Sequence, residues 1–247
     1  MRLFSTLLKN ELKLNIRNMN MVIFAVIMPL IVLVILGVIY GIRPAAEDVS
    51  YTFMEQSFGA LCTISVCAGG LMGLPLVVSD YRERKILKRF KVTPVSPVKL
   101  LAVEFTIYVL YSAVSMLTLI PAAMLIWKVS IHGSWPAFLG SWFLTMVSTL
   151  SIGMMVGGIA KNSKIASVIA CILYFPMLIF SGTTLPFEVM PDAMQKVIGI
   201  FPMPQGIQLM KAAFLDLPVD NIGIPIIVMI AVTALCTGIS AKCFKWE

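Results

Sequence analysis

Charged residues are scarce in this sequence. Only 13% of its 247 residues are Asp, Glu, Lys or Arg, whereas 59% are hydrophobic. A water-soluble domain has about a quarter charged and about half apolar residues, because its surface elements need a polar face. The composition therefore excludes a soluble globular domain and indicates that lipid is the solvent for most of the chain.

Sequence motifs for nucleotide, metal and hydrolase chemistry are absent as well. The sequence has no GxxxxGK(S/T) phosphate loop, no HExxH motif and no GxSxG motif. Its one histidine, His132, supports neither a zinc site nor a His-dependent catalytic pair, and its five cysteines form no CxxC pair. We expect no enzyme activity, no metal site and no cofactor in this chain, and we expect the cysteines to be reduced packing residues.

Long apolar segments are what the sequence does have. A helix needs about 20 such residues to cross the roughly 30 Å hydrocarbon core of a bilayer. Several segments contain proline or glycine, which a membrane tolerates where neighbouring helices pack closely. The sequence predicts an all-α membrane protein with a single transmembrane domain over residues 1–247 and six transmembrane helices. The predicted spans are residues 21–40, 57–79, 105–127, 137–159, 165–180 and 222–239.

The basic residues are distributed unequally between the two sides of these spans. The predicted cytoplasmic segments hold 15 of the 19 Lys and Arg residues, and the outer loops hold Arg43, Lys128, Lys196 and Lys211. By the positive-inside rule, this asymmetry predicts an even number of spans with both termini in the cytoplasm. The net charge of +7 is then a topology signal, so no nucleic acid is expected as a partner.

Residues 3–18 have the pattern of an amphipathic helix. Its apolar residues recur at i, i+4 spacing: Phe4, Leu8, Leu12 and Ile16. Its opposite face is basic and includes Lys9, Lys13 and Arg17. Such an interfacial helix lies in the membrane plane with its cations over anionic headgroups, which makes membrane lipids a partner. The alternative is a plain soluble cap.

The most charged part of the chain is the predicted cytoplasmic connection over residues 80–100. Ile86, Leu87 and Phe90 fall on one side of a short helix by their spacing, with basic residues on the other. The pairs Thr93-Pro94 and Ser96-Pro97 then end this helix, because the residue before a proline is disfavoured in helical conformation. From composition alone, the cations are equally well explained as topology determinants.

This connection resembles the cytoplasmic loop of the ABC transporter type 2 permease family. Arg82, Glu83, Leu87 and the run from Thr93 to Ser96 match the family pattern, whereas Lys85-Ile86 replaces its Gly-Thr pair. The resemblance implies a coupling helix that docks on an ABC ATP-binding subunit, with the interfacial helix completing the contact. The residues it assigns to coupling are Arg82, Glu83, Leu87, Phe90, Thr93, Pro94 and Ser96.

The predicted outer segment between the fifth and sixth spans is hydrophobic, but it is broken too often to cross a bilayer. Its turn residues include Gly182, Pro186, Pro191, Pro202 and Pro204. Irregular backbone at membrane depth must be buried in protein or line a cavity, so we expect two short helices that dip into the outer leaflet. This pattern resembles the external re-entrant helical hairpin of the same family, and the resemblance extends over essentially the whole chain.

The resemblance implies the transmembrane permease subunit of an ATP-driven exporter in the cell (plasma) membrane of a prokaryote. Two copies, or this chain and a related permease, would form the translocation pathway. A separate ABC ATP-binding subunit would hold ATP and Mg. Because the spans carry little fixed charge, we expect an amphipathic or lipid-like substrate such as a drug, a peptide antibiotic or a glycan.

Two other classes of membrane protein remain open at this stage. An ion-gradient secondary transporter would normally carry intramembrane acids, and Glu104, at the cytoplasmic start of the third span, is a possible intramembrane polar site. Pairing of Glu104 with an Arg or Lys of the preceding loop is the simpler expectation. The other class is a non-transporting immunity or sensor subunit.

Overall fold

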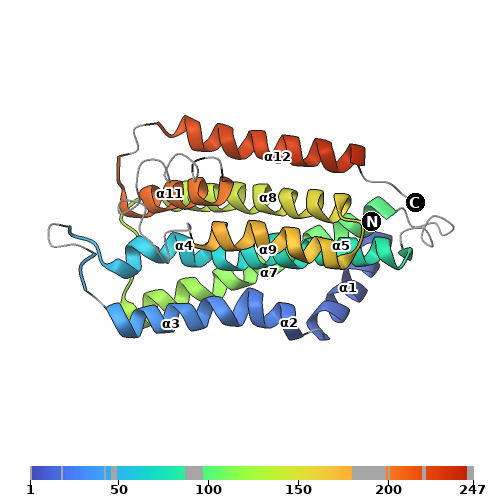
Figure 1. Cartoon of the computed structure of the whole chain (residues 1–247). Helices are drawn as coiled ribbons and strands as arrows, with labels where there is room; N and C mark the ends of the chain where they lie inside the picture. Colours follow the sequence, from blue (N-terminus) through green and yellow to red (C-terminus); the bar gives the residue numbers. More distant parts are fainter. Residues whose placement is uncertain are drawn as a thin grey trace.

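Helices that lie side by side make up the structure (Figure 1). It is a computed structural model that describes residues 2–17, 19–41, 43–45, 49–86, 97–179, 199, 201–218 and 221–243. Helices cover almost all of these ranges, and one antiparallel bridge pairs Pro44 with Thr52 in the connection after the first span. The predicted all-α class is confirmed for this part of the chain.

The first two spans each contain a short π-helical turn. The first comprises α2 (Met19–Val22), η1 (Ile23–Ile27) and α3 (Met28–Tyr40); the second comprises α4 (Phe53–Cys67), η2 (Ala68–Gly73) and α5 (Leu74–Glu83). Pro29 and Pro75 follow these turns, in the first turn of α3 and of α5. A proline lacks an N–H and its ring crowds the carbonyl four residues earlier, so a wider turn before it relieves the clash.

Six further helices of the described chain lie outside these two spans. They are α1 (Arg2–Arg17), α7 (Pro97–Trp127), α8 (Trp135–Ile159), α9 (Ser163–Ile179), α11 (Pro202–Leu215) and α12 (Gly223–Cys243). The predicted interfacial helix, residues 3–18, therefore corresponds to α1. The second span is longer than its prediction, because the helix continues past Ser79 to Glu83.

Five helices of the described chain are long and apolar enough to cross a membrane. They are Ile23–Tyr40, Phe53–Glu83, Val98–Trp127, Trp135–Ile159 and Gly223–Lys242. The helix at the position of the fifth predicted span, α9, is apolar but has only 17 residues. At 1.5 Å per residue it is about 26 Å long, slightly less than a hydrocarbon core of about 30 Å.

The direction of α12 relative to α8 determines the path of the chain. Ser148 Oγ of α8 donates to the carbonyl oxygen of Met229 in α12 over 3.3 Å. Further along both helices, Met154 and Ala241 line one cavity. The two helices thus run in the same direction, so the chain must return to the other end of the bundle between them. In the described chain, α9 makes this return (Figure 1).

Glycines bring the second and fourth spans into backbone contact. A Cβ atom on Gly153 of α8 would collide with the carbonyl oxygen of Gly70 in η2, and one on Gly157 would lie 2.7 Å from Cβ of Val78. Only a hydrogen side chain permits this approach. The close packing that the small residues predict is therefore present, and it fixes α8 against η2 and α5.

A network of polar contacts holds the opposite end of the second span, where α4 begins. Thr52 and Glu55 form a capping box: Thr52 Oγ1 accepts from the Glu55 N–H, and Glu55 Oε2 accepts from the Thr52 N–H over 2.8 Å. The buried Glu55 also accepts from the backbone N–H and the hydroxyl of Ser130. These bonds join the start of α4 to the connection between α7 and α8.

The helix α11 is buried against the same half of the bundle. It begins with Pro202 and Pro204, both buried, and packs on α8, α4 and α12. Gly206 allows a close approach to Thr145 of α8. The predicted turn residues Gly182, Pro186 and Pro191 lie outside the described residues.

Candidate coupling site

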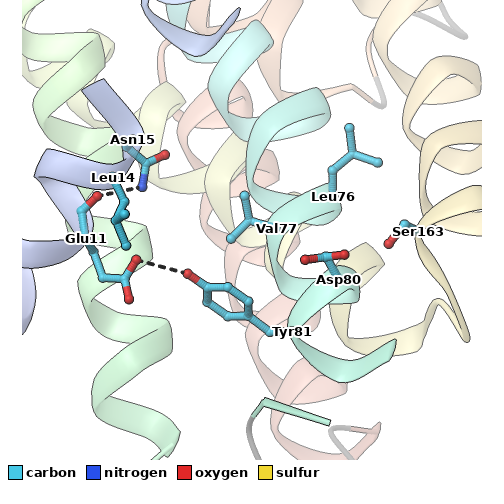
Figure 2. A pocket seen from close by; sticks show the side chains of 8 residues that line it. All are labelled: Glu11, Leu14, Asn15, Leu76, Val77, Asp80, Tyr81 and Ser163. Atoms are coloured by element: carbon cyan, nitrogen blue, oxygen red, sulfur yellow. Dashed lines mark hydrogen bonds between the residues drawn. The ribbon is translucent and has the colours of Figure 1, made fainter. Parts of the chain in front are cut away.

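The end of α5 is where several helices meet. A cavity of about 410 Å³ lies there, between α1, α5 and the start of α9. Figure 2 shows the eight residues that line it: Glu11, Leu14, Asn15, Leu76, Val77, Asp80, Tyr81 and Ser163. Of the predicted coupling residues, Arg82 and Glu83 lie at this junction, whereas Leu87, Phe90, Thr93, Pro94 and Ser96 lie outside the described residues.

Tyr81 joins α1, α5 and α7 through one hydroxyl group. Its oxygen lies 2.9 Å from Oε1 of Glu104 in α7 and 3.2 Å from Oε2 of Glu11 in α1. A phenol has a single hydrogen, so it donates to only one carboxylate at a time. The two acids are therefore held around one shared donor, which places α1 against α7.

Glu104 is fully buried at this junction. Its Oε2 atom has no hydrogen-bond partner among the described residues, while its Oε1 atom accepts from Tyr81. Among the described residues, Glu104 is thus bonded to a phenol; most of the preceding loop, which would supply the expected Arg or Lys partner, lies outside the described residues. The position of Glu104 in a spanning helix agrees with the prediction, but its role as a polar site remains a prediction.

Arg82 binds the end of α8. Its Nη1 atom donates to the carbonyl oxygens of Gly158 and Ala160, the latter at 3.0 Å, with Gly157 O further away at 3.4 Å. Since α8 ends at Ile159, these carbonyls have no partners within the helix. A guanidinium group supplies several donors and a positive charge, which suits the negative end of a helix dipole.

Glu83 binds the start of the next helix. Its Oε2 atom accepts from the backbone N–H and from the hydroxyl of Ser163, both at 2.9 Å. Asn162 Oδ1 accepts from the Ile165 N–H at 2.9 Å, as an N-cap residue does. A carboxylate at this position suits the positive end of the dipole of α9. Arg82 and Glu83 together therefore join the two sides of the break between α8 and α9.

The helix α5 ends in a tight turn directly after these two residues. Lys85 has a positive φ of 55°, and its N–H donates to the Arg82 carbonyl over 2.9 Å. Arg84 forms an exposed i, i+4 ion pair with Asp80 at 2.8 Å. A positive φ is the conformation that glycine adopts at helix ends. Lys85 stands where the family pattern described above has the glycine of its Gly-Thr pair. The chain therefore forms this turn with a lysine in place of the glycine.

The helix α1 presents two different faces at this junction. Lys9, Lys13 and Arg17 are exposed, as their spacing predicted. On the other side, Phe4, Leu8 and Leu12 are partly buried against the core of the bundle, and α1 packs on α7. Ile16, the last residue of the predicted apolar row, is 52% exposed. At least part of the apolar face is thus covered by protein.

Sequence reasoning missed Tyr81, Glu11 and Ser163. Tyr81 and Glu11 are 70 residues apart, and no local pattern links them. Ser163 left a signal: Asn162-Ser163 is a typical helix start that follows directly after a glycine-containing helix end. Two helix ends that meet at a short break need capping groups from elsewhere, and the charged end of α5 is the nearest source.

Comparison with known proteins shows the family of this chain. The family model for ABC-2 type transporters matches residues 2–215, which include every element of the coupling site. The chain belongs to the ABC-2 type transporter family. The resemblance found from the residues is thereby confirmed, and the chain is a multi-pass membrane protein of a transport family.

Two curated relatives are similar to this ABC-2 family member over about half of its length. The inner membrane transport permease YhhJ of Escherichia coli (strain K12) is 26% identical over 132 residues, which are 53% of this chain and 35% of that protein. Nodulation protein J of Sinorhizobium fredii (strain NBRC 101917 / NGR234) is 29% identical over 118 residues, 47% of this chain and 43% of that protein. The matched part is thus less than half of either relative.

Proposed function

We propose that this chain is the permease subunit of an ATP-driven exporter, with a separate ABC ATP-binding subunit that holds ATP and Mg. Membership of the ABC-2 type transporter family supports this function, and the name of the relative YhhJ describes a transport permease of an inner membrane. A second permease copy or a related permease completes the translocation pathway. The location is the plasma membrane of a prokaryote.

The proposed topology has six crossings with both termini in the cytoplasm. The parallel directions of α8 and α12 support it, because they require a crossing between them and α9 lies at that position. The end of the bundle that carries α1, Arg82 and Lys164 is rich in basic residues, as the cytoplasmic side is. In this topology α11 belongs to an external re-entrant hairpin whose first part lies outside the described residues.

The junction at the end of α5 is the observation that carries the coupling mechanism. Three consecutive residues, Tyr81, Arg82 and Glu83, bind groups of α1, α7, α8 and α9. The proposed docking segment follows directly after them. A push by the ATP-binding subunit on this segment therefore acts on four helices together, and ATP binding biases the bundle between states of different substrate affinity.

The proposed substrate is amphipathic or lipid-like. In the described spans, Glu55 and Glu104 are the acids that lie buried, and each is at one end of the bundle. The spans thus offer few fixed charges that could hold a hydrophilic ion. A drug, a peptide antibiotic and a lipid-linked glycan all fit this chemistry.

The test begins with purification of the tagged chain from its native membrane in mild detergent, followed by mass spectrometry of the proteins that co-purify. We expect a P-loop ATPase in stoichiometric amount.

In the reconstituted complex, Arg82→Glu combined with Leu87→Pro should abolish substrate-stimulated ATP hydrolysis while membrane insertion stays normal. Arg84→Glu is the control, because Arg84 is exposed and, among the described residues, it pairs with Asp80 of its own helix. Normal coupling in the first variant would refute the proposed role of this junction.

The buried Glu104 favours one second candidate, a transporter driven by an ion gradient. An intramembrane acid next to a second carboxylate is a common feature of ion-coupled carriers. In that case the chain purifies alone, and proteoliposomes transport substrate without ATP. Glu104→Gln then abolishes gradient-driven transport, whereas in the ATP-driven complex it leaves the dependence on ATP in place.

A further inference from the structure

A groove of about 630 Å³ lies between α7 and α12, at the end of the bundle that carries α1. Its sides come from the first part of α7 and the last part of α12, and residues of α8, including Ser151 and Met154, lie between them. α12 itself is attached to the bundle through α8 and α11. The groove is on a different face from the cavity at Tyr81, with which it shares no lining residue.

The surface of this groove is more apolar than the hydroxyl-bearing residues among its lining side chains suggest. Thr106, Ser151 and Thr233 line it, but each hydroxyl donates to the carbonyl four residues earlier in its own helix, at 2.7 Å. Such internal bonds satisfy the hydroxyl groups without a partner in the groove. Apart from Thr237 and Ser240, the groups that remain to face an occupant are mostly methyl and methylene groups, so the groove suits a hydrocarbon chain.

The length of the groove matches one leaflet of a bilayer. It extends from Val98 to Thr106 on α7 and from Thr233 to Ala241 on α12. Each stretch covers eight helical steps, or about 12 Å at 1.5 Å per residue. Half of a hydrocarbon core is about 15 Å thick. The groove therefore accommodates the chain of a lipid in a single leaflet.

Two lysines flank the end of the groove that faces the membrane surface. Lys99 follows the lining residue Val98, and Lys242 follows the lining residue Ala241. Both lysines are exposed, one on each side of the groove. Lysines at this depth attract anionic headgroups. The combination of an apolar channel one leaflet deep with two cations at its mouth is complementary to an anionic phospholipid.

We propose that this groove binds one anionic phospholipid of the cytoplasmic leaflet. One acyl chain lies along the groove between α7 and α12, and the phosphate contacts Lys99 and Lys242. The lipid fills the space between two helices that have few direct contacts, and so it fixes α12 relative to α7. This site does not depend on the identity of the transported substrate.

Native mass spectrometry of the delipidated full-length protein tests this site. The probe is palmitoyl-oleoyl phosphatidylglycerol, with phosphatidylcholine of the same chains as the zwitterionic control. We expect one phosphatidylglycerol to bind preferentially. Each neutralisation, Lys99→Gln or Lys242→Gln, should weaken its binding about five-fold, and the double variant about 25-fold. Lys161→Gln with Lys164→Gln is the control of equal charge, because these exposed lysines lie just before α9 and in its first turn, and neither lines the groove.

A second pair of variants separates the groove from general surface charge. Thr237→Trp fills the groove, and it should reduce binding of both lipids while the lysines stay in place. Leu235→Trp adds the same side chain at a position on α12 that is 64% exposed and outside the groove, so binding should not change.

Equal binding of the two lipids, or equal losses in the two lysine double variants, would overturn the proposal. So would a change of oligomeric state in Thr237→Trp without lipid loss, because the occupant would then be a second copy of this chain.

Discussion

Arg82 and Glu83 are neighbours in the chain, and they bind opposite ends of the break between α8 and α9. Arg82 donates to the last carbonyls of α8, and Glu83 accepts from the first N–H of α9. Each charge is placed at the helix end whose partial charge has the opposite sign. This end of the second span is thereby joined to the fourth and fifth predicted spans through backbone groups at two helix ends.

Loss of the Arg82 side chain should destabilise the protein through the end of α8. In Arg82→Ala, the carbonyls of Gly158 and Ala160 lose their donor, and we expect a loss of about 1–3 kcal/mol in the free energy of unfolding. Arg84→Ala, which breaks an exposed i, i+4 pair, should change stability by less than about 0.5 kcal/mol. Denaturation in mixed micelles measures both. Equal effects of the two variants would contradict the assignment.

Removal of the Tyr81 hydroxyl should weaken the contact between α1 and the bundle. Tyr81→Phe leaves Glu11 and Glu104 without their shared donor, at a cost of about 1–3 kcal/mol. Glu104→Gln keeps an acceptor for the hydroxyl, so its effect should be smaller. The two changes act on one hydrogen bond, so the double variant should cost less than the sum of the single variants. Strict additivity would show that Tyr81 and Glu104 act separately.

Glycine at position 85 should stabilise the turn that follows α5. Lys85 has a φ of 55°, which costs a side-chain-bearing residue roughly 1 kcal/mol relative to glycine. Lys85→Gly should therefore raise the free energy of unfolding by up to about 1 kcal/mol, and Lys85→Ala should not. A destabilising effect of the glycine would indicate that the Lys85 side chain makes a contact that outweighs its backbone strain.

A methyl group at Gly153 should separate the second and fourth spans. In Gly153→Ala, the new Cβ collides with the carbonyl oxygen of Gly70, and overpacking of this kind costs about 1–3 kcal/mol. Gly140 is the matched control on the same helix, because a Cβ there meets no atom within 4 Å. Thermal unfolding in detergent should show a large shift for Gly153→Ala and almost none for Gly140→Ala.

The helical architecture could be predicted from the sequence because it depends on local composition. Runs of about twenty apolar residues locate spanning helices whatever their neighbours are, and the spacing of Lys9, Lys13 and Arg17 locates the exposed face of α1. The extension of the second span to Glu83 was missed, because charged residues end an apolar run without ending a helix. The length of an apolar run therefore gives the membrane-embedded part and not the helix.

The contacts of the candidate site could not be predicted in the same way. Which residue meets Glu104 depends on the rotation of three helices about their axes, and apolar composition is almost insensitive to that rotation. A cation of the nearby loop was the simplest expectation, and most of that loop lies outside the described residues; the bond from the Tyr81 hydroxyl, which the structure shows, had no signal in the sequence. The role of Arg82 depends likewise on the position of the end of α8, 76 residues away.

The π-helical turn η2 lets the second span hold one residue more than a regular α-helix of the same phase. Deletion of one residue between Ala68 and Gly73 would restore α-helical pitch, and the two halves of the span would keep nearly the same relative rotation. A deletion within the regular helix α5 would instead turn Tyr81, Arg82 and Glu83 by about 100° relative to the end capped by Thr52 and Glu55, because each residue rotates an α-helix by about 100°. The wide turn is therefore the place in this span where a change of one residue in length should preserve the contacts at both ends.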